Sequence, residues 1–452
     1  MSSFAEERQA RRHPHDSAPD HRTEFQRDRD RVLYAAAWRR LAHVTQVVSP
    51  AEGIVFHNRL THTLEVAQIG RRIAEKLLSE EGEEEADRLG GINPDVVETA
   101  ALVHDLGHPP YGHAVETELN RLVSRYVHDG YEGNAQSFRI VTNLATRRLA
   151  FGGLNLTRAA LNAILKYPWA RAEKNEYREQ RKGGAVDRHK KWGVYSIEET
   201  DYKFARGETL DTDEKNKSVE AEIMDWADDV AYAVHDVEDF YRAGRIPLER
   251  FMRDGPELDF FAEYAEAKLK ETLELSQAEI KTILLDVTKG GQIGRPYVGS
   301  TEQRAALKAS SGDLIGECVT MVSLAEGIDD KPRLRIPEDT KKKVEVLKQL
   351  TWCYVIDDRA VKTQQHGQRK VVRELFRIYF AATGSSKDAH RGILPEGSIE
   401  QLDQLKSAGN APDKASRARV VSDIISSMTE RQLLLTHRKL TGIELGSMTD
   451  LL

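Results

Sequence analysis

The chain has 452 residues, of which 31% are charged and 40% are hydrophobic, and its formal net charge is −7. These values are typical of a soluble globular protein of two or three domains, and the acidic balance argues against a dedicated nucleic-acid coat. No apolar run approaches the roughly 18 residues that span a bilayer, the charged N-terminus lacks a secretion signal, and two distant cysteines give no disulfide framework, so we expect a cytoplasmic protein.

Charge dominates residues 1–30, which we expect to form a mobile N-terminal arm. Helical periodicity begins near Val32, and an apolar stripe of helical spacing runs through residues 60–77. Asn93 and Pro94 then predict the N-cap and first turn of a helix that ends at the pair His104-Asp105.

The segment 171–217 is crowded with charge and predicts a surface loop or lid. A strong helical pattern follows over about 219–241, and the C-terminal half alternates helical stretches with polar linkers. Alternating β-branched runs are scarce, so we expect an all-α fold with a helical core over 31–245 and a helical C-terminal region over 246–452.

The clearest sign of chemistry is the stretch 104–113, HDLGHPPYGH, in which three histidines and an aspartate follow an apolar helix. Imidazole and carboxylate groups together suit a divalent metal that polarises phosphoryl oxygens and activates water. The dipeptide His-Asp also occurs at 15–16, 128–129 and 235–236, but only here does it combine an apolar lead-in with a Gly-His-Pro-Pro turn. We therefore expect this stretch to be the centre of an active site.

Two further helices carry candidate ligands. His62 lies at the start of an amphipathic helix, where a structural histidine near the helix start is the more frequent explanation of such a residue taken alone. Asp228, Tyr232 and Asp236 recur every four residues and so share one face of a helix. A carboxylate among core-like residues needs a cation or strong donors, and either Asp228 or its neighbour Asp229 fits that description.

Taken in chain order, the segment 58–62 (NRLTH), the stretch 104–113, the segment 132–136 (EGNAQ) and the Asp228-Asp229 helix resemble the HD-superfamily deoxyguanosine triphosphate triphosphohydrolases. The resemblance covers about residues 27–242. It implies an almost entirely helical fold with a metal held between helices by His62, His104, Asp105 and Asp228. The family's Asp-x-x-x-Tyr-x-x-x-Asp register selects Asp228 over Asp229. Such ligands suit Mg²⁺ or Mn²⁺, and also Fe or Co.

The resemblance also implies the reaction: water attacks the α-phosphorus of a deoxynucleoside triphosphate, with dGTP the default substrate, and inorganic triphosphate leaves. His113 and Glu116 resemble the family's catalytic pair, and His108 resembles a histidine that contacts the α-phosphate. The expected substrate contacts are Arg59, Gln46, Tyr232, Asp236, Lys166 and Lys191, where ordinary solvated lysines are an equal alternative for the last two. This chain has Tyr131 where some relatives have a further histidine.

Other functions remain compatible with these residues. An HD site also suits a nucleotidase or a cyclic-nucleotide phosphodiesterase, and a nucleotide-sensing regulatory protein would need the site only for binding. Family members commonly form tetramers or hexamers and several respond to nucleotide effectors, so the resemblance implies that region 246–452 serves oligomerisation or regulation. Some relatives bind single-stranded DNA, and the acidic balance of this chain gives no support for or against such binding.

Overall fold

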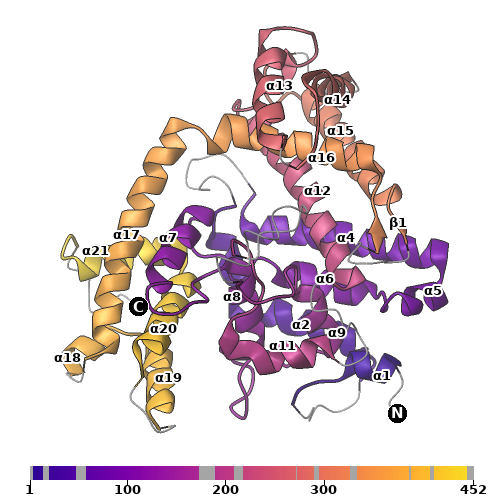
Figure 1. Cartoon of the computed structure of the whole chain (residues 1–452). Coiled ribbons are helices and arrows are strands. Elements are labelled where there is room, and N and C mark those ends of the chain that lie inside the picture. Colours follow the sequence, from indigo (N-terminus) through magenta and orange to yellow (C-terminus); the bar gives the residue numbers. More distant parts are fainter. Residues whose placement is uncertain are drawn as a thin grey trace.

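Helices form nearly all of the regular structure (Figure 1). The computed structural model describes residues 4–13, 20–46, 57–172, 189–207, 217–270, 272–289, 295–325, 333–385, 388–407 and 412–444. Within these ranges the only strands are the two-residue β1 (Ser323–Leu324) and β2 (Leu334–Arg335), which pair antiparallel. The expected all-α fold is confirmed. No helix in the described ranges is long and apolar enough to cross a membrane.

A first hydrophobic cluster is built around three helices that pack on one another: α4 (Arg59–Glu81), α6 (Pro94–Val103) and α12 (Val219–Arg242). The α4 stripe predicted from the sequence is buried from Ala67 to Leu77, whereas Leu64 near the start of the helix is 45% exposed. As predicted, the Asn93 side chain caps α6 by accepting hydrogen bonds from the next two free backbone amides, and Pro94 occupies the first turn.

Further helices extend this cluster on both sides. From the N-terminal half these are α2 (Glu24–Tyr34) and α9 (Arg158–Ile164), which both pack on α6. From the C-terminal half they are α13 (Pro256–Leu269), α14 (Gln277–Lys289), α15 (Thr301–Thr320) and α16 (Glu338–Thr351). The packing therefore does not follow a division at residue 245, because residues on both sides of it share one hydrophobic cluster.

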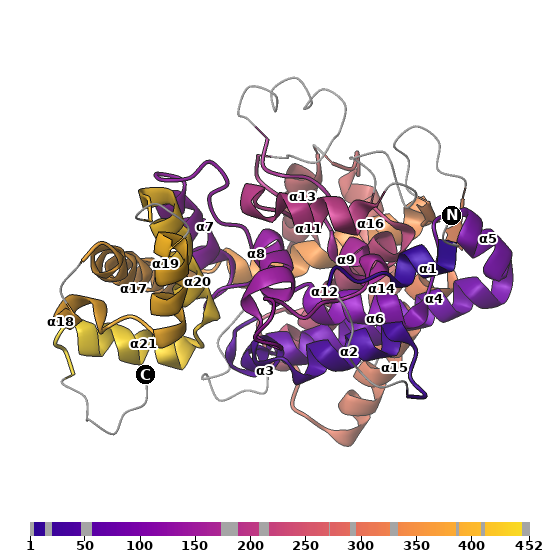
Figure 2. The same ribbon diagram turned by 90° about the horizontal axis from the view of Figure 1, so that it is seen from below.

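A second hydrophobic cluster joins α7 (His113–Val123) to α17 (Arg359–Thr383), α19 (Glu396–Ser407), α20 (Lys414–Ser427) and α21 (Glu430–Leu440). Val115 and Leu119 of α7 are fully buried in it together with Leu375 of α17. Figure 2 shows these helices gathered on one side of the molecule, apart from α4, α6 and α12. Helix α7 thus belongs by sequence to the first half and by packing to the C-terminal region.

The remaining elements are short. They are α1 (Phe4–Gln9), α3 (Ala36–Arg40), η1 (Leu41–His43), α5 (Glu83–Arg88), α8 (Gly133–Arg139), the π-helical turn η3 (Ile140–Leu144), η5 (Ser196–Glu198), α11 (Glu199–Arg206), η6 (Leu248–Arg250), the π-helical turn η7 (Trp352–Ile356) and α18 (Asp388–Arg391). The predicted loop or lid 171–217 includes η5 and α11, with Trp192 and Tyr195 fully buried beside them, while 173–188 and 208–216 lie outside the described residues.

Residues 4–13 and 20–30, which we expected to be a mobile arm, pack against the core instead. The Arg8 guanidinium donates to the Glu220 carboxylate of α12 at 2.6 Å, and that of Arg11 donates to Asp28 at 2.5 Å, with all four side chains nearly buried. Phe25 joins the first hydrophobic cluster. The charges that suggested a solvated arm are therefore paired with one another and with the core.

Candidate metal and catalytic site

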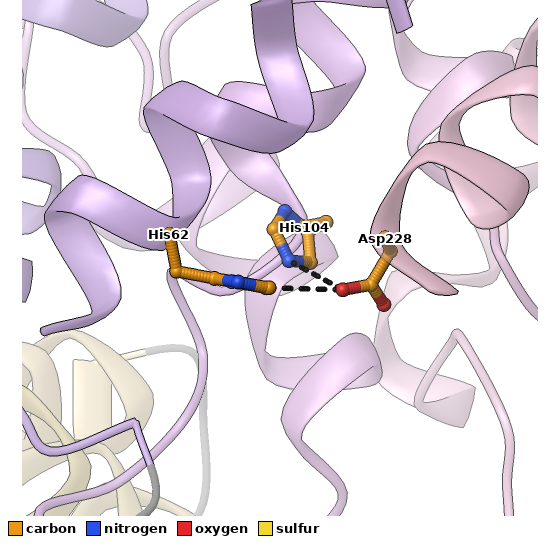
Figure 3. A group of neighbouring side chains, drawn as sticks. All are labelled: His62, His104 and Asp228. Atoms are coloured by element: carbon orange, nitrogen blue, oxygen red, sulfur yellow. Dashed lines mark hydrogen bonds and ion pairs between the residues drawn. The ribbon is translucent and has the colours of Figure 1, made fainter. Parts of the chain in front are cut away.

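Three side chains from three parts of the first cluster converge: His62 from α4, His104 just after α6, and Asp228 from α12 (Figure 3). Nε2 of His62 lies 3.0 Å from Oδ1 of Asp228, and Nε2 of His104 lies 3.6 Å from the same oxygen. One ligand atom from each residue lies within 4.8 Å of the other two. This arrangement allows all three to bind one cation.

Local structure fixes both histidines. His62 stands in the first turn of α4, whose start is set by a capping box between Asn58 and Thr61. Nδ1 of His104 lies 2.6 Å from the carbonyl oxygen of Ala101, to which it donates. This tautomer leaves a lone pair on Nε2, which is buried and has no hydrogen-bond partner among the described residues. An orphaned imidazole nitrogen facing a carboxylate fits a bound cation.

Lys166 keeps Asp228 ionised. Its ammonium group lies 2.6 Å from Oδ2 of Asp228 and 2.8 Å from Oδ1 of Asp225. Burial would raise the pKa of Asp228, but Lys166, followed by His104 and His62, holds it well below its usual range. Lys166 is itself largely buried and therefore is not an ordinary solvated lysine.

Asp229 faces a different part of the protein. Its Oδ1 lies 3.0 Å from Nζ of Lys348 on α16, and burial raises the pKa of its carboxyl group. The structure thus separates the two neighbouring aspartates, with Asp228 beside the histidines and Asp229 beside α16.

Asp105 stands next to the three converging side chains and is tied to Arg59. Its Oδ2 accepts a hydrogen bond of 2.6 Å from Nη1 of Arg59, and its Oδ1 lies 3.5 Å from Nε2 of His104. Both Asp105 and Arg59 are buried. Burial would raise the pKa of Asp105, but the Arg59 guanidinium, followed by His104 and His108, holds it well below its usual range. Asp105 is therefore a second ionised carboxylate at the site.

The predicted pair His113–Glu116 forms across the first turn of α7. Nδ1 of His113 lies 2.6 Å from Oε2 of Glu116, and the imidazole is 68% exposed although the carboxylate is buried. The other carboxylate oxygen accepts a hydrogen bond of 3.0 Å from the backbone amide of Gly133. Burial would raise the pKa of Glu116, but Lys191 and His113 hold it well below its usual range. Glu116 therefore orients an imidazole whose free nitrogen faces outward.

His108 lies between the pair and the converging ligands. Its ring is 5.5 Å from that of His113, and its Nδ1 is 3.0 Å from Oδ1 of Asp105. The ring packs so closely on Gly133 that a Cβ atom there would stand 3.1 Å from it. Burial, with repulsion from Arg59, lowers the pKa of His108 to about 4, so its imidazole is neutral near pH 7.

Lys191 is not among the three converging side chains and instead joins Glu132 to Glu116 of the His113–Glu116 pair. Its Nζ lies 3.0 Å from Oε1 of Glu132 and 3.4 Å from Oε1 of Glu116. Glu132 caps α8 by accepting from the backbone amides of Asn134 and Ala135. Glu132 belongs to the segment 132–136 that resembles a family motif, but the sequence indicates no role for this residue, because its partner Lys191 lies 59 residues further along the chain.

The three residues expected at the sugar lie around the same site. Tyr232 and Asp236 continue the Asp228 face of α12, and burial raises the pKa of Asp236 well above its usual range. Gln46 lies beside Gly112, where a Cβ atom would stand 3.9 Å from the Gln46 carbonyl oxygen and 3.2 Å from Nη2 of Arg59. Gly112 has a φ of 57° and is therefore required both by its backbone conformation and by these neighbours.

Arg40, which the sequence did not single out, holds the loop 104–112 in place. Its buried guanidinium donates to the carbonyl oxygens of Leu106 at 2.7 Å and His108 at 2.9 Å, and to that of Met428 at 3.2 Å. Arg40 thereby links the loop 104–112 to the C-terminal helices of the second cluster. The site as a whole lies between these clusters.

Comparison with known proteins agrees with this arrangement. The family model of the HD domain matches residues 59–233, and that of the phosphohydrolase-associated domain matches residues 334–439. A deoxyguanosinetriphosphate triphosphohydrolase-like protein of Streptomyces coelicolor is 36% identical over 441 residues, covering 93% of each chain. Proteins of the same description are 36% identical in Corynebacterium efficiens, over 94% of this chain and 93% of theirs, and 32% identical in Bifidobacterium longum, over 96% and 86%.

Proposed function

This chain belongs to the family of HD-domain deoxyguanosinetriphosphate triphosphohydrolase-like proteins, and we propose that it hydrolyses deoxynucleoside triphosphates to a deoxynucleoside and inorganic triphosphate. One observation carries the proposal. A buried group of two imidazoles and an ionised carboxylate stands on one side of the site, and an oriented His–Glu pair stands on the other. The first suits a cation at a phosphate, and the second suits proton transfer to a leaving group.

His62, His104, Asp105 and Asp228 would hold a divalent cation, which is Mg²⁺ or Mn²⁺ on the chemistry of the donor atoms, with Fe or Co as the alternative. Bound there, the cation would supply Lewis-acid polarisation of the α-phosphate and a lower pKa for an attacking water. The orphaned Nε2 of His104 and the low pKa of Asp228 support this assignment.

Arg59 and Lys166 would bind the phosphate chain. Each now pairs with a carboxylate of the site, Arg59 with Asp105 and Lys166 with Asp228. A guanidinium fork and an ammonium group beside these acids can turn from carboxylate to phosphate oxygens over a short distance. Lys191 is a weaker candidate for this role, because the acids that engage its ammonium group are Glu132 and Glu116 and not a carboxylate of the proposed metal site.

His113 would protonate the 5′-oxygen of the leaving deoxynucleoside while water forms the new bond to the α-phosphorus. Its Nδ1 is held by Glu116, so the outward nitrogen is the one that gives up a proton. His108, between this pair and Asp105, would contact the α-phosphate.

The sugar would lie along α12. Asp236 would face the sugar, with Gln46 near its 3′-hydroxyl. A Tyr232 ring beneath C2′ would exclude a ribose hydroxyl by its bulk. By resemblance to the family we also propose that the protein works in the cytoplasm as a homo-oligomer, a tetramer or hexamer, under control of a nucleotide effector.

Product analysis tests the proposal. The purified protein would be incubated with Mg²⁺ or Mn²⁺ and each deoxynucleotide and ribonucleotide separately, and then with nucleotide mixtures in case an effector is needed. Deoxynucleoside together with intact triphosphate is the expected result, and the ranking of substrates would give the base preference. Orthophosphate or pyrophosphate instead would show that another bond is cleaved, as in a nucleotidase. Binding of nucleotides without turnover in any mixture would favour a nucleotide sensor.

A further inference from the structure

An arginine-lined pocket lies away from the site described above, between α2 and the segment that follows η3. Its volume is about 230 Å³, and its walls include Arg22, Arg27, Arg31 and Arg147 together with Asp30 and Tyr34. None of these residues takes part in the candidate metal and catalytic site. We call this feature the arginine pocket.

The sequence of α2 places several of these groups on one face. Arg27, Arg31 and Tyr34 follow each other at intervals of four and three residues, so their side chains lie in a row along the helix. Arg27 and Arg31 are 7% and 8% exposed, whereas Tyr34 at the end of the row is 78% exposed. The floor of the arginine pocket is therefore cationic and its rim aromatic.

The positive charge of the arginine pocket is only partly balanced. Arg22 pairs with Asp30 at 2.7 Å and with Asp20 at 2.6 Å, and Arg27 pairs with Asp20 at 3.2 Å and with Glu24 at 3.3 Å. Arg31 donates to the carbonyl oxygen of Leu154 at 3.3 Å, and its nearest carboxylate, Asp28, is 3.8 Å away and already engaged by another arginine. Within the described part of the chain, Arg147 makes no ion pair or hydrogen bond. Two guanidinium groups thus face the pocket without a close acidic partner.

The pKa values of two of these arginines are lowered, which also indicates unbalanced positive charge. Burial, with repulsion from Arg11 and some from Arg147, lowers the pKa of Arg31 to about 10. Burial and the neighbouring arginines Arg148 and Arg11 also lower the pKa of Arg147. Arg31 is buried and Arg147 is exposed beside it, and an anion bound in the pocket would relieve the repulsion between these two guanidinium groups.

We propose that the arginine pocket binds a phosphate chain, either as inorganic triphosphate or as the triphosphate group of a nucleotide. Guanidinium forks match phosphate oxygens in pairs, which an ammonium group does not. The volume of the pocket is below the roughly 300–1,000 Å³ typical of sites that enclose an organic ligand, so a phosphate chain fits inside and any base would remain at the rim beside Tyr34. The proposal does not depend on the reaction at the metal site.

Titration calorimetry of the full-length protein with inorganic triphosphate tests this site. Arg147→Gln is the decisive variant, because Arg147 is exposed and its loss should leave the fold intact. Arg148→Gln is the matched control, since its neighbour is equally exposed and does not line the pocket. We expect Arg147→Gln to weaken triphosphate binding about tenfold or more, the usual effect of one lost charge-assisted contact, and Arg148→Gln to change it less than twofold. Equal affinities in the wild type and both variants would overturn the proposal.

A second set of titrations identifies the source of the phosphate chain. Inorganic triphosphate, a non-hydrolysable deoxynucleoside triphosphate analogue and the corresponding deoxynucleoside would each be tested against the wild type and Arg147→Gln. If the first two bind alike, the phosphate chain alone is the ligand, and tighter binding of the analogue would identify a nucleotide. A deoxynucleoside whose binding is weakened by Arg147→Gln, with triphosphate unaffected, would refute a phosphate site.

Discussion

Replacing Asp228 by asparagine, with Asp229→Asn as the matched control, tests the proposed metal site most directly. The two residues are adjacent, but only Asp228 faces the histidines, with its Oδ1 3.0 Å from Nε2 of His62. Asp229 instead pairs with Lys348 at 3.0 Å. Asparagine has nearly the same size as aspartate, so each variant removes a charge and little else.

We expect a much larger loss of metal affinity and turnover in Asp228→Asn than in Asp229→Asn. Asp228→Asn removes an ionised oxygen ligand, and since even indirect supporting groups are worth about 10–100-fold in metal affinity, we expect a loss of at least 100-fold. Turnover should fall roughly 1,000-fold. The fold should survive, because Lys166 keeps its second partner, Asp225, at 2.8 Å. Asp229→Asn breaks one partly exposed ion pair, which is worth about 0.2–1 kcal/mol of unfolding free energy, and should leave metal affinity unchanged.

Titration calorimetry with Mn²⁺ would measure metal affinity, release of inorganic triphosphate would measure turnover, and thermal unfolding would measure stability. We expect metal affinity and turnover to fall together in Asp228→Asn and to stay unchanged in Asp229→Asn. This expectation would be refuted if Asp228→Asn kept its metal affinity, or if Asp229→Asn lost it while remaining folded.

Three further predictions follow from particular contacts. His113→Ala should slow turnover roughly 10²–10⁴-fold with metal affinity unchanged, and a loss of metal binding would exclude a proton-donor role. Burial would lower the pKa of His57, but Asp239 at 2.6 Å and Glu65 at 2.8 Å raise it to about 10. Because this pKa exceeds the value of about 6.5 in the unfolded chain, the stabilisation is complete below pH 6.5 and is lost as pH rises to about 10. The free energy of unfolding should therefore decline by up to about 5 kcal/mol over this range in the wild type and not in His57→Gln, and parallel pH profiles would contradict this origin. Phe376→Ala, in the second cluster, should cost about 3–5 kcal/mol of stability and lower turnover without affecting metal affinity; equal loss of turnover in Phe261→Ala, its counterpart in the first cluster, would count against a special role of the second cluster.

The last of these predictions reflects how the site is assembled. The proposed metal ligands belong to helices of the first hydrophobic cluster, whereas His113 and Glu116 stand on α7, which packs in the second. A change in the way the two clusters meet would therefore move the proton donor relative to the phosphate. Arg40 opposes such movement, since it bonds the loop 104–112 and Met428 at once.

The sequence alone was sufficient to predict the helices that carry the site. The predicted helix over about 219–241 is α12, Val219–Arg242, and the Asn93 cap and Pro94 begin α6 where they were expected to. These features depend on residues within one or two turns of each other, so a linear pattern contains the whole signal. The same holds for the contact between His113 and Glu116, which are three residues apart.

The tertiary structure decided which partner each buried face and charge meets. Adjacent residues of a helix point about 100° apart, so the orientation of α12 turns Asp228 toward His62 and Asp229 toward Lys348, 119 residues away. Similarly, the sequence does not show that α7 is buried against α17. The charges of the N-terminal segment suggested that it is exposed to solvent, whereas in the structure Arg8 forms a buried ion pair with Glu220. A periodic pattern shows that a face is buried or a charge is present, and only long-range packing determines what lies opposite.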